Sequence, residues 1–295
     1  NFKGLKMMKE SDIVFLNGEF LPKDKAKISV FDRGFIFGDG IYEVVPVMNG
    51  VLIDKIEFWE RFKRSLKEIA LNFPYKDSEF ESILNELIAK NALKEGGVYM
   101  QITRGIASRD FAFTKGLQPT IMAFVYAANI QNNELASKGI TVVSVPDIRW
   151  KRRDIKSISL LAQCYAKEMA VNAGADEGFM VENGKVTEAT SASAFIIKDK
   201  TLITKPFSNE ILPGIRRQNI LKFARELNLS VAERAFSMNE VYEADEVFIS
   251  AASLPILGVI KADGKMIANG KVGKFTQLLR QRYLQKMRNE AGLGV

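Results

Sequence analysis

The sequence predicts an α/β protein of two domains, with strands and helices mixed in each (α+β). The chain has 295 residues, which is long for one small domain and fits two. Two Asn-Gly pairs, Asn17-Gly18 and Asn49-Gly50, each stand between short apolar runs, as in β-hairpins. Apolar residues recur at helical spacing between 58 and 70 and between 80 and 88.

The first domain is expected to cover residues 1–127. Its two hairpins pair strands at 13–16 with 19–21 and at 41–48 with 51–53. Two helices follow, one after the other, and then strands at 98–103 and 120–126. Residues 128–139 are polar, with a Gln-Asn-Asn run, and are expected to link the domains.

The second domain is expected to cover residues 140–295. It begins with a strand at 140–145 and a helix at about 159–173, followed by a hairpin near 182–185. A Leu-Pro-Gly turn at 212–214 leads into a helix at 215–227. Strands at 247–249 and 257–260 and a closing helix at 272–287 complete it.

Composition excludes several kinds of catalysis. The chain has no histidine, so it holds neither a Ser-His-Asp triad nor a metal site that needs imidazole, and we expect no metal. Cys164 is the one cysteine, which rules out an internal disulfide. Its apolar neighbours predict a buried thiol in a reducing compartment, the cytoplasm. A lysine, carboxylates or a cofactor must then carry the chemistry.

No membrane or nucleic-acid partner is expected. No apolar run approaches the roughly 18 residues of a membrane helix, and the N-terminus lacks the apolar core of a signal peptide. The net charge of +7 invites a nucleic-acid hypothesis. Glutamates interrupt the basic residues, however, and no aromatic–basic platform or helix-turn-helix pattern is present. We interpret the excess as solvated surface and a site for an anionic ligand.

Lys156 stands where the basic stretch 149–153 meets an apolar run. Nearby cations and partial desolvation favour the neutral, nucleophilic form of a lysine. An ordinary solvated turn before a helix explains the same pattern, and locally it is the simpler interpretation. Glu188 likewise is either a carboxylate for a protonated pyridine nitrogen or a surface residue at a turn.

An anion site is the third candidate. Gly214 precedes a predicted helix, whose first N–H groups and dipole favour an anion. Arg61 offers a further ligand, or else a salt bridge on a helix surface.

In its motifs the chain resembles the fold-type IV pyridoxal-phosphate enzymes, and among them the D-amino-acid aminotransferases most closely. The matching segments span essentially the whole chain in family order and lie at 32–45, 101–105, 149–161, 186–188 and 212–215. The resemblance implies two domains with pyridoxal 5′-phosphate between them. It also implies a homodimer in which the Arg109 loop reaches the partner's active site.

The resemblance assigns roles to particular residues. Lys156 forms the Schiff base with the cofactor aldehyde and shuttles a proton, and Glu188 pairs with the pyridine nitrogen. The remaining cofactor contacts are expected from Arg61, Leu212, Gly214, Ile215, Arg216, Ala251 and Ala252. The substrate contacts are expected from Tyr42, Val44, Arg109 and Phe111.

Two positions depart from the family pattern. Ala252 stands where threonine is frequent, so a hydroxyl ligand of the phosphate is missing. Phe111 stands at the position of a histidine that helps to bind the substrate carboxylate. Its loss should weaken that binding by about 1 kcal/mol and make the pocket more apolar. Alternatively, Phe111 merely repacks the loop.

The function expected from the resemblance is ping-pong transfer of an amino group from a D-amino acid to a 2-oxo acid such as 2-oxoglutarate or pyruvate. Alternatives on the same fold are an (R)-selective amine transaminase, a branched-chain L-aminotransferase and an aminodeoxychorismate lyase. A nucleic-acid-binding module is the alternative from another class.

Overall fold

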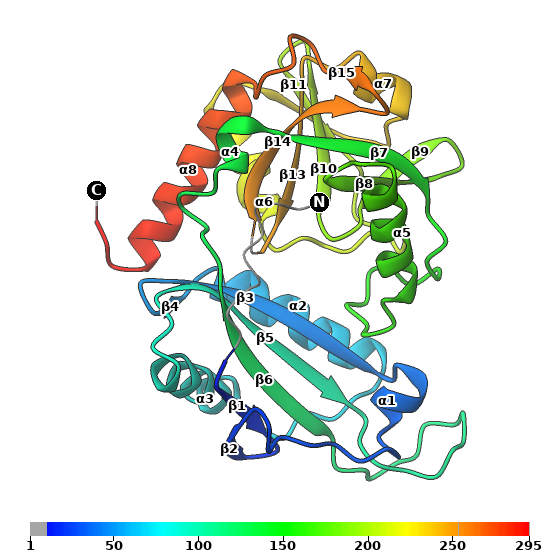
Figure 1. The fold of residues 1–295 in the computed structure, drawn as a ribbon, viewed down its shortest axis with the longest axis vertical. Helices are drawn as coiled ribbons and strands as arrows, with labels where there is room; N and C mark the ends of the chain where they lie inside the picture. Colours follow the sequence, from blue (N-terminus) through cyan, green and yellow to red (C-terminus); the bar gives the residue numbers. More distant parts are fainter. Residues whose placement is uncertain (1–10, 253, 295) are drawn as a thin grey trace.

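The structure is a computed structural model that describes residues 11–252 and 254–294. This part of the chain forms two β-sheets, one in each half of the molecule, with helices packed against both (Figure 1). The expectation about a signal peptide concerns residues outside this part. Among the described residues, no helix combines the length and apolar character needed to cross a membrane.

The first half is built on an antiparallel sheet with the strand order β2-β1-β6-β5-β3-β4. Both Asn-Gly hairpins are confirmed, with positive φ at all four residues. The strands are β1 (Ile13–Leu16), β2 (Glu19–Pro22), β3 (Gly40–Met48), β4 (Val51–Leu52), β5 (Glu95–Thr103) and β6 (Thr120–Ala127). The helices are α1 (Arg33–Phe37), α2 (Lys55–Glu68) and α3 (Asp77–Lys90).

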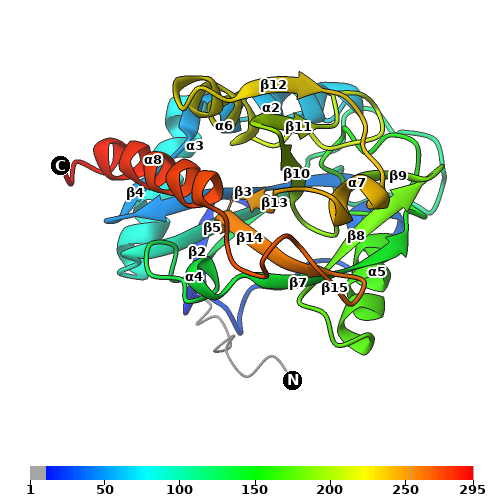
Figure 2. The same cartoon turned by 90° about the horizontal axis from the view of Figure 1, so that it is seen from above.

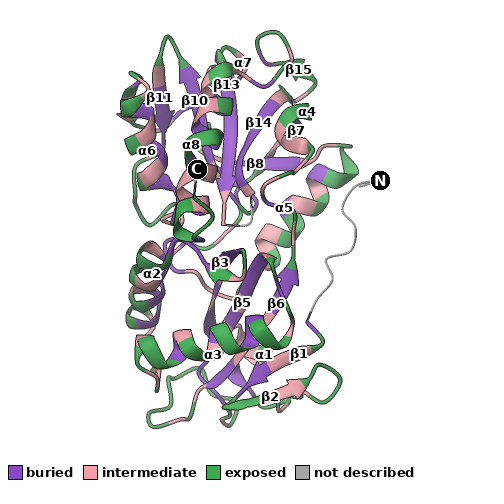
Figure 3. Cartoon of the chain, turned by 90° about the vertical axis from the view of Figure 1, so that its left-hand side faces the viewer, coloured by how far each residue is buried: buried purple, intermediate pink, exposed green. Residues whose placement is uncertain are grey.

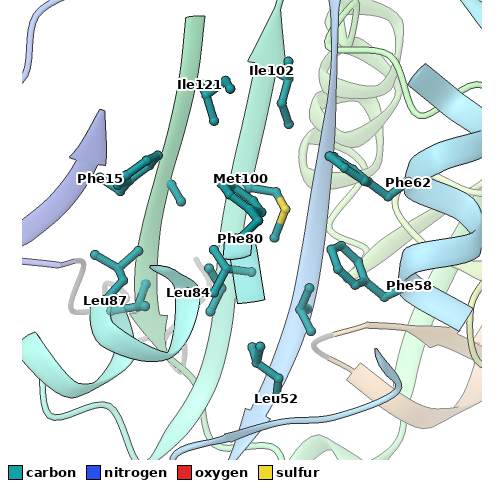
Figure 4. Packing of buried hydrophobic residues seen from close by; sticks show 14 of the residues in the cluster. Phe15, Leu52, Phe58, Phe62, Phe80, Leu84, Leu87, Met100, Ile102 and Ile121 are labelled. Carbon is teal, nitrogen blue, oxygen red and sulfur yellow. The ribbon is translucent and has the colours of Figure 1, made fainter. Parts of the chain in front are cut away.

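Helices α2 and α3 cover one face of this sheet and bury its main core. Phe58 and Phe62 of α2 and Phe80 of α3 are almost wholly buried against the strands (Figure 4). Because side chains alternate along a strand, Tyr42 and Val44 point to the other face and stay half-buried. That face is therefore free to line a site.

The second half is built on a mixed sheet with the strand order β12-β11-β10-β13-β14-β7-β8-β9, and β15 pairs with β14. Helix α8 runs beside β14 (Figure 2). The strands are β7 (Ile140–Pro146), β8 (Glu177–Glu182), β9 (Lys185–Ala189), β10 (Ser193–Lys198), β11 (Thr201–Thr204), β12 (Ser230–Glu233), β13 (Glu246–Ala251), β14 (Leu254–Ala262) and β15 (Lys265–Met266). The helices are α4 (Leu135–Lys138), α5 (Leu161–Asn172), α6 (Arg217–Glu226), α7 (Met238–Tyr242) and α8 (Lys274–Glu290).

A shared core fixes the two halves against each other. Met48 and Ile53 of the first half are fully buried in one cluster with Phe248, Leu279 and Tyr283 of the second. Figure 3 shows buried strands in both sheets beside helices whose outer faces are exposed. The polar stretch expected as a linker contains α4 and runs between the sheets. The domain boundaries at 127 and 139 themselves stay a prediction.

Cys164 corrects the prediction of a buried thiol, because its side chain is exposed. Ala166 and Ala170 are the buried positions of α5, which packs on β7 and β8. Cys164 precedes Ala166 by two residues, about 200° around the helix, and so faces away from the sheet.

Candidate active site

A cavity of about 490 Å³ lies between the two halves, a size typical of small-molecule sites. Its wall comes from strand β3, helix α2, the segment before α5, β9, the start of α6 and the end of β13. Most of the predicted site residues line it: Tyr42, Arg61, Lys156, Glu188, Leu212, Gly214, Ile215, Arg216, Ala251 and Ala252. Val44, Arg109 and Phe111 do not line it.

Lys156 is held on the edge of the first sheet although it follows β7 of the second. Its carbonyl accepts a 2.9 Å hydrogen bond from the Tyr42 N–H, and the Ile158 N–H donates to the Gly40 carbonyl. The Lys156 Nζ lies 4.0 Å from the centroid of the Tyr42 ring. The backbone pairing therefore fixes the amine in the cavity beside an aromatic face.

The arginines before Lys156 are bound by carboxylates, contrary to the idea that they act on the lysine as bare neighbouring cations. Arg149 pairs with Asp147 and Glu188, at 2.8 and 2.7 Å. Arg152 pairs with Asp154 and Glu68, and Arg153 pairs with Asp147 and Glu182. Each arginine of the stretch is thus answered locally.

Glu188 is buried on β9, at 6% exposure, with one oxygen fully engaged. Its Oε2 accepts hydrogen bonds from Arg149 Nη1 at 2.7 Å and from the Leu212 N–H at 3.1 Å. No hydrogen bond from the described residues reaches Oε1. Burial raises the pKa of the Glu188 carboxyl, and the charge of Arg149 works in the opposite direction. The site thus holds a desolvated carboxylate with one oxygen open to a partner.

The start of α6 forms an anion-binding end of the cavity. Within the described residues, no hydrogen bond uses the N–H groups of Gly214, Ile215 or Arg216. The dipole of α6 adds positive potential there. A Cβ on Gly214 would lie 2.7 Å from Ser193 Oγ, so glycine permits the close approach of this turn to β10.

Arg61 completes this end from α2, and it is buried rather than a surface residue. Its Nε and Nη2 bind the two carboxylate oxygens of Glu43 at 2.8 and 2.7 Å, and Nη1 donates to the Pro213 carbonyl at 3.1 Å. These bonds engage three of the five N–H groups of the guanidinium and leave two for an anion. The pairing with Glu43 fixes the plane of Arg61.

Ala251 and Ala252 line the same end, and Ala252 brings no hydroxyl. Instead, the Ala252 carbonyl accepts a hydrogen bond from the Arg216 side chain. Ser253, the last residue of the expected turn, lies outside the described residues.

Arg109 and Phe111 lie on an exposed loop at 105–119 instead of in the cavity, and Phe111 is 77% exposed. The Arg109 guanidinium lies 5.6 Å from the centroid of Phe37 and 5.5 Å from that of Phe111. The loop itself is anchored, because buried Arg33 donates to the carbonyls of Asp110 and Phe111.

Sequence reasoning assigned no role to Arg149 and Glu43, which bind Glu188 and Arg61. Both contacts join residues far apart in the chain, and no local pattern announces them. The described residues also contain no group of three or more Cys, Asp or Glu side chains placed to hold a metal.

Comparisons with known proteins agree with this geometry. The sequence profile of the amino-transferase class IV family matches residues 40–262. A D-alanine aminotransferase of Staphylococcus aureus (strain N315) is 41% identical, and the match covers 92% of this chain and 96% of the relative. A D-alanine aminotransferase of Bacillus licheniformis is 34% identical, over 90% and 93%.

Solved structures share the fold at lower identity. A branched-chain amino acid aminotransferase of Escherichia coli has a TM-score of 0.87 at 24% identity, covering 95% of this chain and 96% of that one. A second branched-chain amino acid aminotransferase, from T.th. and solved with pyridoxamine 5′-phosphate, has a TM-score of 0.86 at 22% identity, over 96% and 95%. The profile match and the two relatives show that the chain belongs to the class IV aminotransferase family.

Proposed function

We propose that this aminotransferase holds pyridoxal 5′-phosphate in the cavity and transfers an amino group from a D-amino acid to a 2-oxo acid such as 2-oxoglutarate or pyruvate. One observation carries the proposal: an amine, a buried carboxylate and a helix start with unpaired N–H groups line a single cavity. Aminotransferases of this fold use this cofactor. Support for D-amino acids comes from the relatives named D-alanine aminotransferase.

The residues present fit the cofactor. When bound, it supplies an aldehyde for an amino group and a pyridine ring that draws electrons from the substrate Cα. Lys156 would hold the aldehyde end, and its Nζ is the group available to move a proton at the substrate Cα. The Tyr42 ring, 4.0 Å from Nζ, would limit the directions in which this amine can point.

Glu188 would hold a proton on the ring nitrogen. Its Oε1 accepts no hydrogen bond from the described residues, and burial makes a bond to a protonated partner strong. Arg149 on Oε2 keeps the carboxylate charged and oriented. Leu212, whose N–H donates to the same oxygen, would pack beside the ring.

The phosphate would bind at the start of α6. The N–H groups of Ile215 and Arg216, next to Gly214, and the two remaining N–H groups of Arg61 supply the donors. Ala251 and Ala252 would close this end without adding a hydroxyl.

The substrate carboxylate would be bound by Tyr42 and by Arg109 of a second copy of the chain. We propose a homodimer, because Arg109 lies outside the cavity of its own chain while large apolar side chains around it are exposed. Phe35 is 70% exposed and Phe111 77%. An interface over α1 and the 105–119 loop would cover these rings. Val44 and Phe111 would then contribute to the pocket for the substrate side chain.

We also propose that the enzyme works in the cytoplasm. The exposed thiol of Cys164 is free, as is usual for proteins of reducing compartments.

The test is a product assay with each enantiomer of alanine and 2-oxoglutarate. We expect pyruvate and glutamate to form in equal amounts from D-alanine only, and Lys156→Ala to abolish the reaction while leaving thermal unfolding nearly unchanged. Turnover by Lys156→Ala would remove the basis of the proposal. Product from L-alanine would favour the branched-chain L-type alternative, and pyruvate without an acceptor would favour a lyase.

A further inference from the structure

The side chain of Arg216 is an unusual feature of the anion-binding end. Only its backbone N–H has a role so far, yet the guanidinium is buried, at 2% exposure. Its Nη2 donates to the Ala252 carbonyl, and its Nε lies 3.4 Å from Asp54 Oδ2. The guanidinium carbon lies 4.8 Å from the centroid of the Tyr283 ring.

Asp54 is placed to serve Arg216 rather than its own helix. It stands at the N-cap of α2 with φ 58°, and its side chain makes no capping hydrogen bond. Its Oδ1 instead accepts from the Tyr283 hydroxyl at 2.8 Å and from Lys286 Nζ at 2.7 Å, both on α8. Asp54 and Arg216 therefore connect α2, which carries Arg61, to the first turn of α6 and to α8.

The positive charge in this cluster is incompletely answered. Nε and Nη1 of Arg216 have no hydrogen-bond partner among the described residues. Burial and the nearby charge of Arg216 lower the pKa of Arg280 to about 10, so a second buried cation lies within electrostatic range. Burying an arginine without a full set of partners is costly, and such a charge beside a cavity favours an anion in it.

We propose that Arg216, oriented by Asp54, is a positioning residue for phosphate binding. Its guanidinium ties the first turn of α6 to the Ala252 turn on one side and to α2 on the other. It thereby sets the spacing between the N–H groups of Ile215 and Arg216 and the donors of Arg61. It also places a fixed positive charge behind the phosphate, at the end where Ala252 offers no hydroxyl. This inference rests on the proposed function.

The test compares two ligands that differ only in the phosphate. Apoenzyme is titrated with pyridoxal 5′-phosphate and with pyridoxal, and binding is followed by the absorbance of the lysine-linked ligand. Arg216→Met should weaken binding of the phosphorylated ligand by about tenfold or more, since bonds to charged groups are strong. Binding of pyridoxal should change little. Arg216→Lys, which keeps the charge, should retain part of the preference.

Two further variants make the result specific. Asp54→Asn, which nearly preserves side-chain shape, should reduce the phosphate preference in the same direction and serves if Arg216→Met folds poorly. Arg282→Met removes an exposed charge of α8 and should leave both affinities unchanged.

Three outcomes would overturn the inference. Equal losses for the two ligands would mean that Arg216 supports only the fold. An unchanged preference for the phosphorylated ligand in both Arg216→Met and Asp54→Asn would mean that the guanidinium does not act on the phosphate. If wild-type protein forms no lysine-linked band with either ligand, the proposed function fails, and this inference fails with it.

Discussion

Glu188 and Arg149 meet across 39 positions of sequence, and their contact shows how single residues set the chemistry of the cavity. A buried carboxylate alone would tend to take up a proton, because burial raises its pKa. Arg149 opposes this, and Asp147 holds Arg149 in turn through hydrogen bonds at 3.0 and 2.8 Å. The carboxylate is thus kept charged for a protonated ring nitrogen.

Phe111 gives a prediction at the same scale. Arg109 lies within cation–π range of both Phe37 and Phe111, so rings orient it where the family has a histidine donor. Phe111→His should add one hydrogen bond to the substrate carboxylate, worth about 1 kcal/mol, and lower KM for small D-amino acids roughly fivefold. The kcat should change little.

The control for this variant is an amine substrate that lacks a carboxylate, for which KM should not fall. Phe111→Leu, which removes the ring without adding a donor, should raise KM for D-amino acids. An unchanged KM in both variants would mean that Phe111 only packs the loop.

At the scale of elements, the stretch from 32 to 40 is a structural clamp as well as a motif. Asp32 caps α1 by accepting from the Gly34 N–H, and it also accepts from the hydroxyls of Thr103 and Thr120. Buried Asp39 binds Arg33 at 2.7 Å and Arg104 at 2.8 Å. These contacts fasten both ends of the 105–119 loop, which carries Arg109.

Asp39→Asn should therefore loosen the loop without touching the cavity. It leaves two buried arginines without their shared carboxylate, which costs several kcal/mol in comparable pairs. We expect faster hydrogen exchange at 106–117 and a KM for D-amino acids raised about tenfold or more, since a charge-assisted bond is lost. The KM for an amine without a carboxylate should stay the same.

Asp24→Asn is the matched control, because Asp24 is exposed and pairs only with Lys25 among the described residues. Equal loss with both kinds of substrate in Asp39→Asn would show a general defect of folding and refute the positioning role.

How much of the fold could be predicted depended on whether the signal was local. The Asn-Gly hairpins and the helices α2, α3, α5, α6 and α8 were predicted, since turn residues and helical spacing are written in short stretches. The helices α1 and α7 have five residues each, too few to show a period. Strands β10 to β12 gave no clear alternation, because β10 is apolar along most of its length.

The site shows the same division. Lys156 and Glu188 were ambiguous locally and gained their predicted roles only from the resemblance. The partners Glu43, Arg149 and Asp54 depend on contacts between elements, and no local spacing encodes these. The surroundings of Arg109 could not be predicted at all, because they depend on the loop that Arg33 anchors.

At the scale of the whole molecule, the proposed homodimer explains why a carboxylate-binding arginine lies outside its own cavity. If Arg109 serves the partner's site, two defective variants should complement each other. Arg109→Ala and Lys156→Ala should each be inactive toward D-alanine, and a mixture allowed to exchange subunits should regain activity. One site of each mixed dimer then holds an intact Lys156 together with an intact Arg109.

Dilution gives the independent check on assembly. Activity should fall as sedimentation shows dimers separating into monomers. Full turnover by monomers, or a mixture no more active than Arg109→Ala alone, would refute the shared site.

The central claim is that Lys156 holds the cofactor and that the cavity accepts the amino group of D-amino acids. The most direct measurement is the absorbance spectrum of the protein loaded with pyridoxal 5′-phosphate, before and after D-alanine and, separately, L-alanine. We predict a band of the lysine-linked cofactor that D-alanine bleaches and L-alanine does not, and that Lys156→Ala lacks. Bleaching by L-alanine alone, or a protein that forms no such band, would contradict the account.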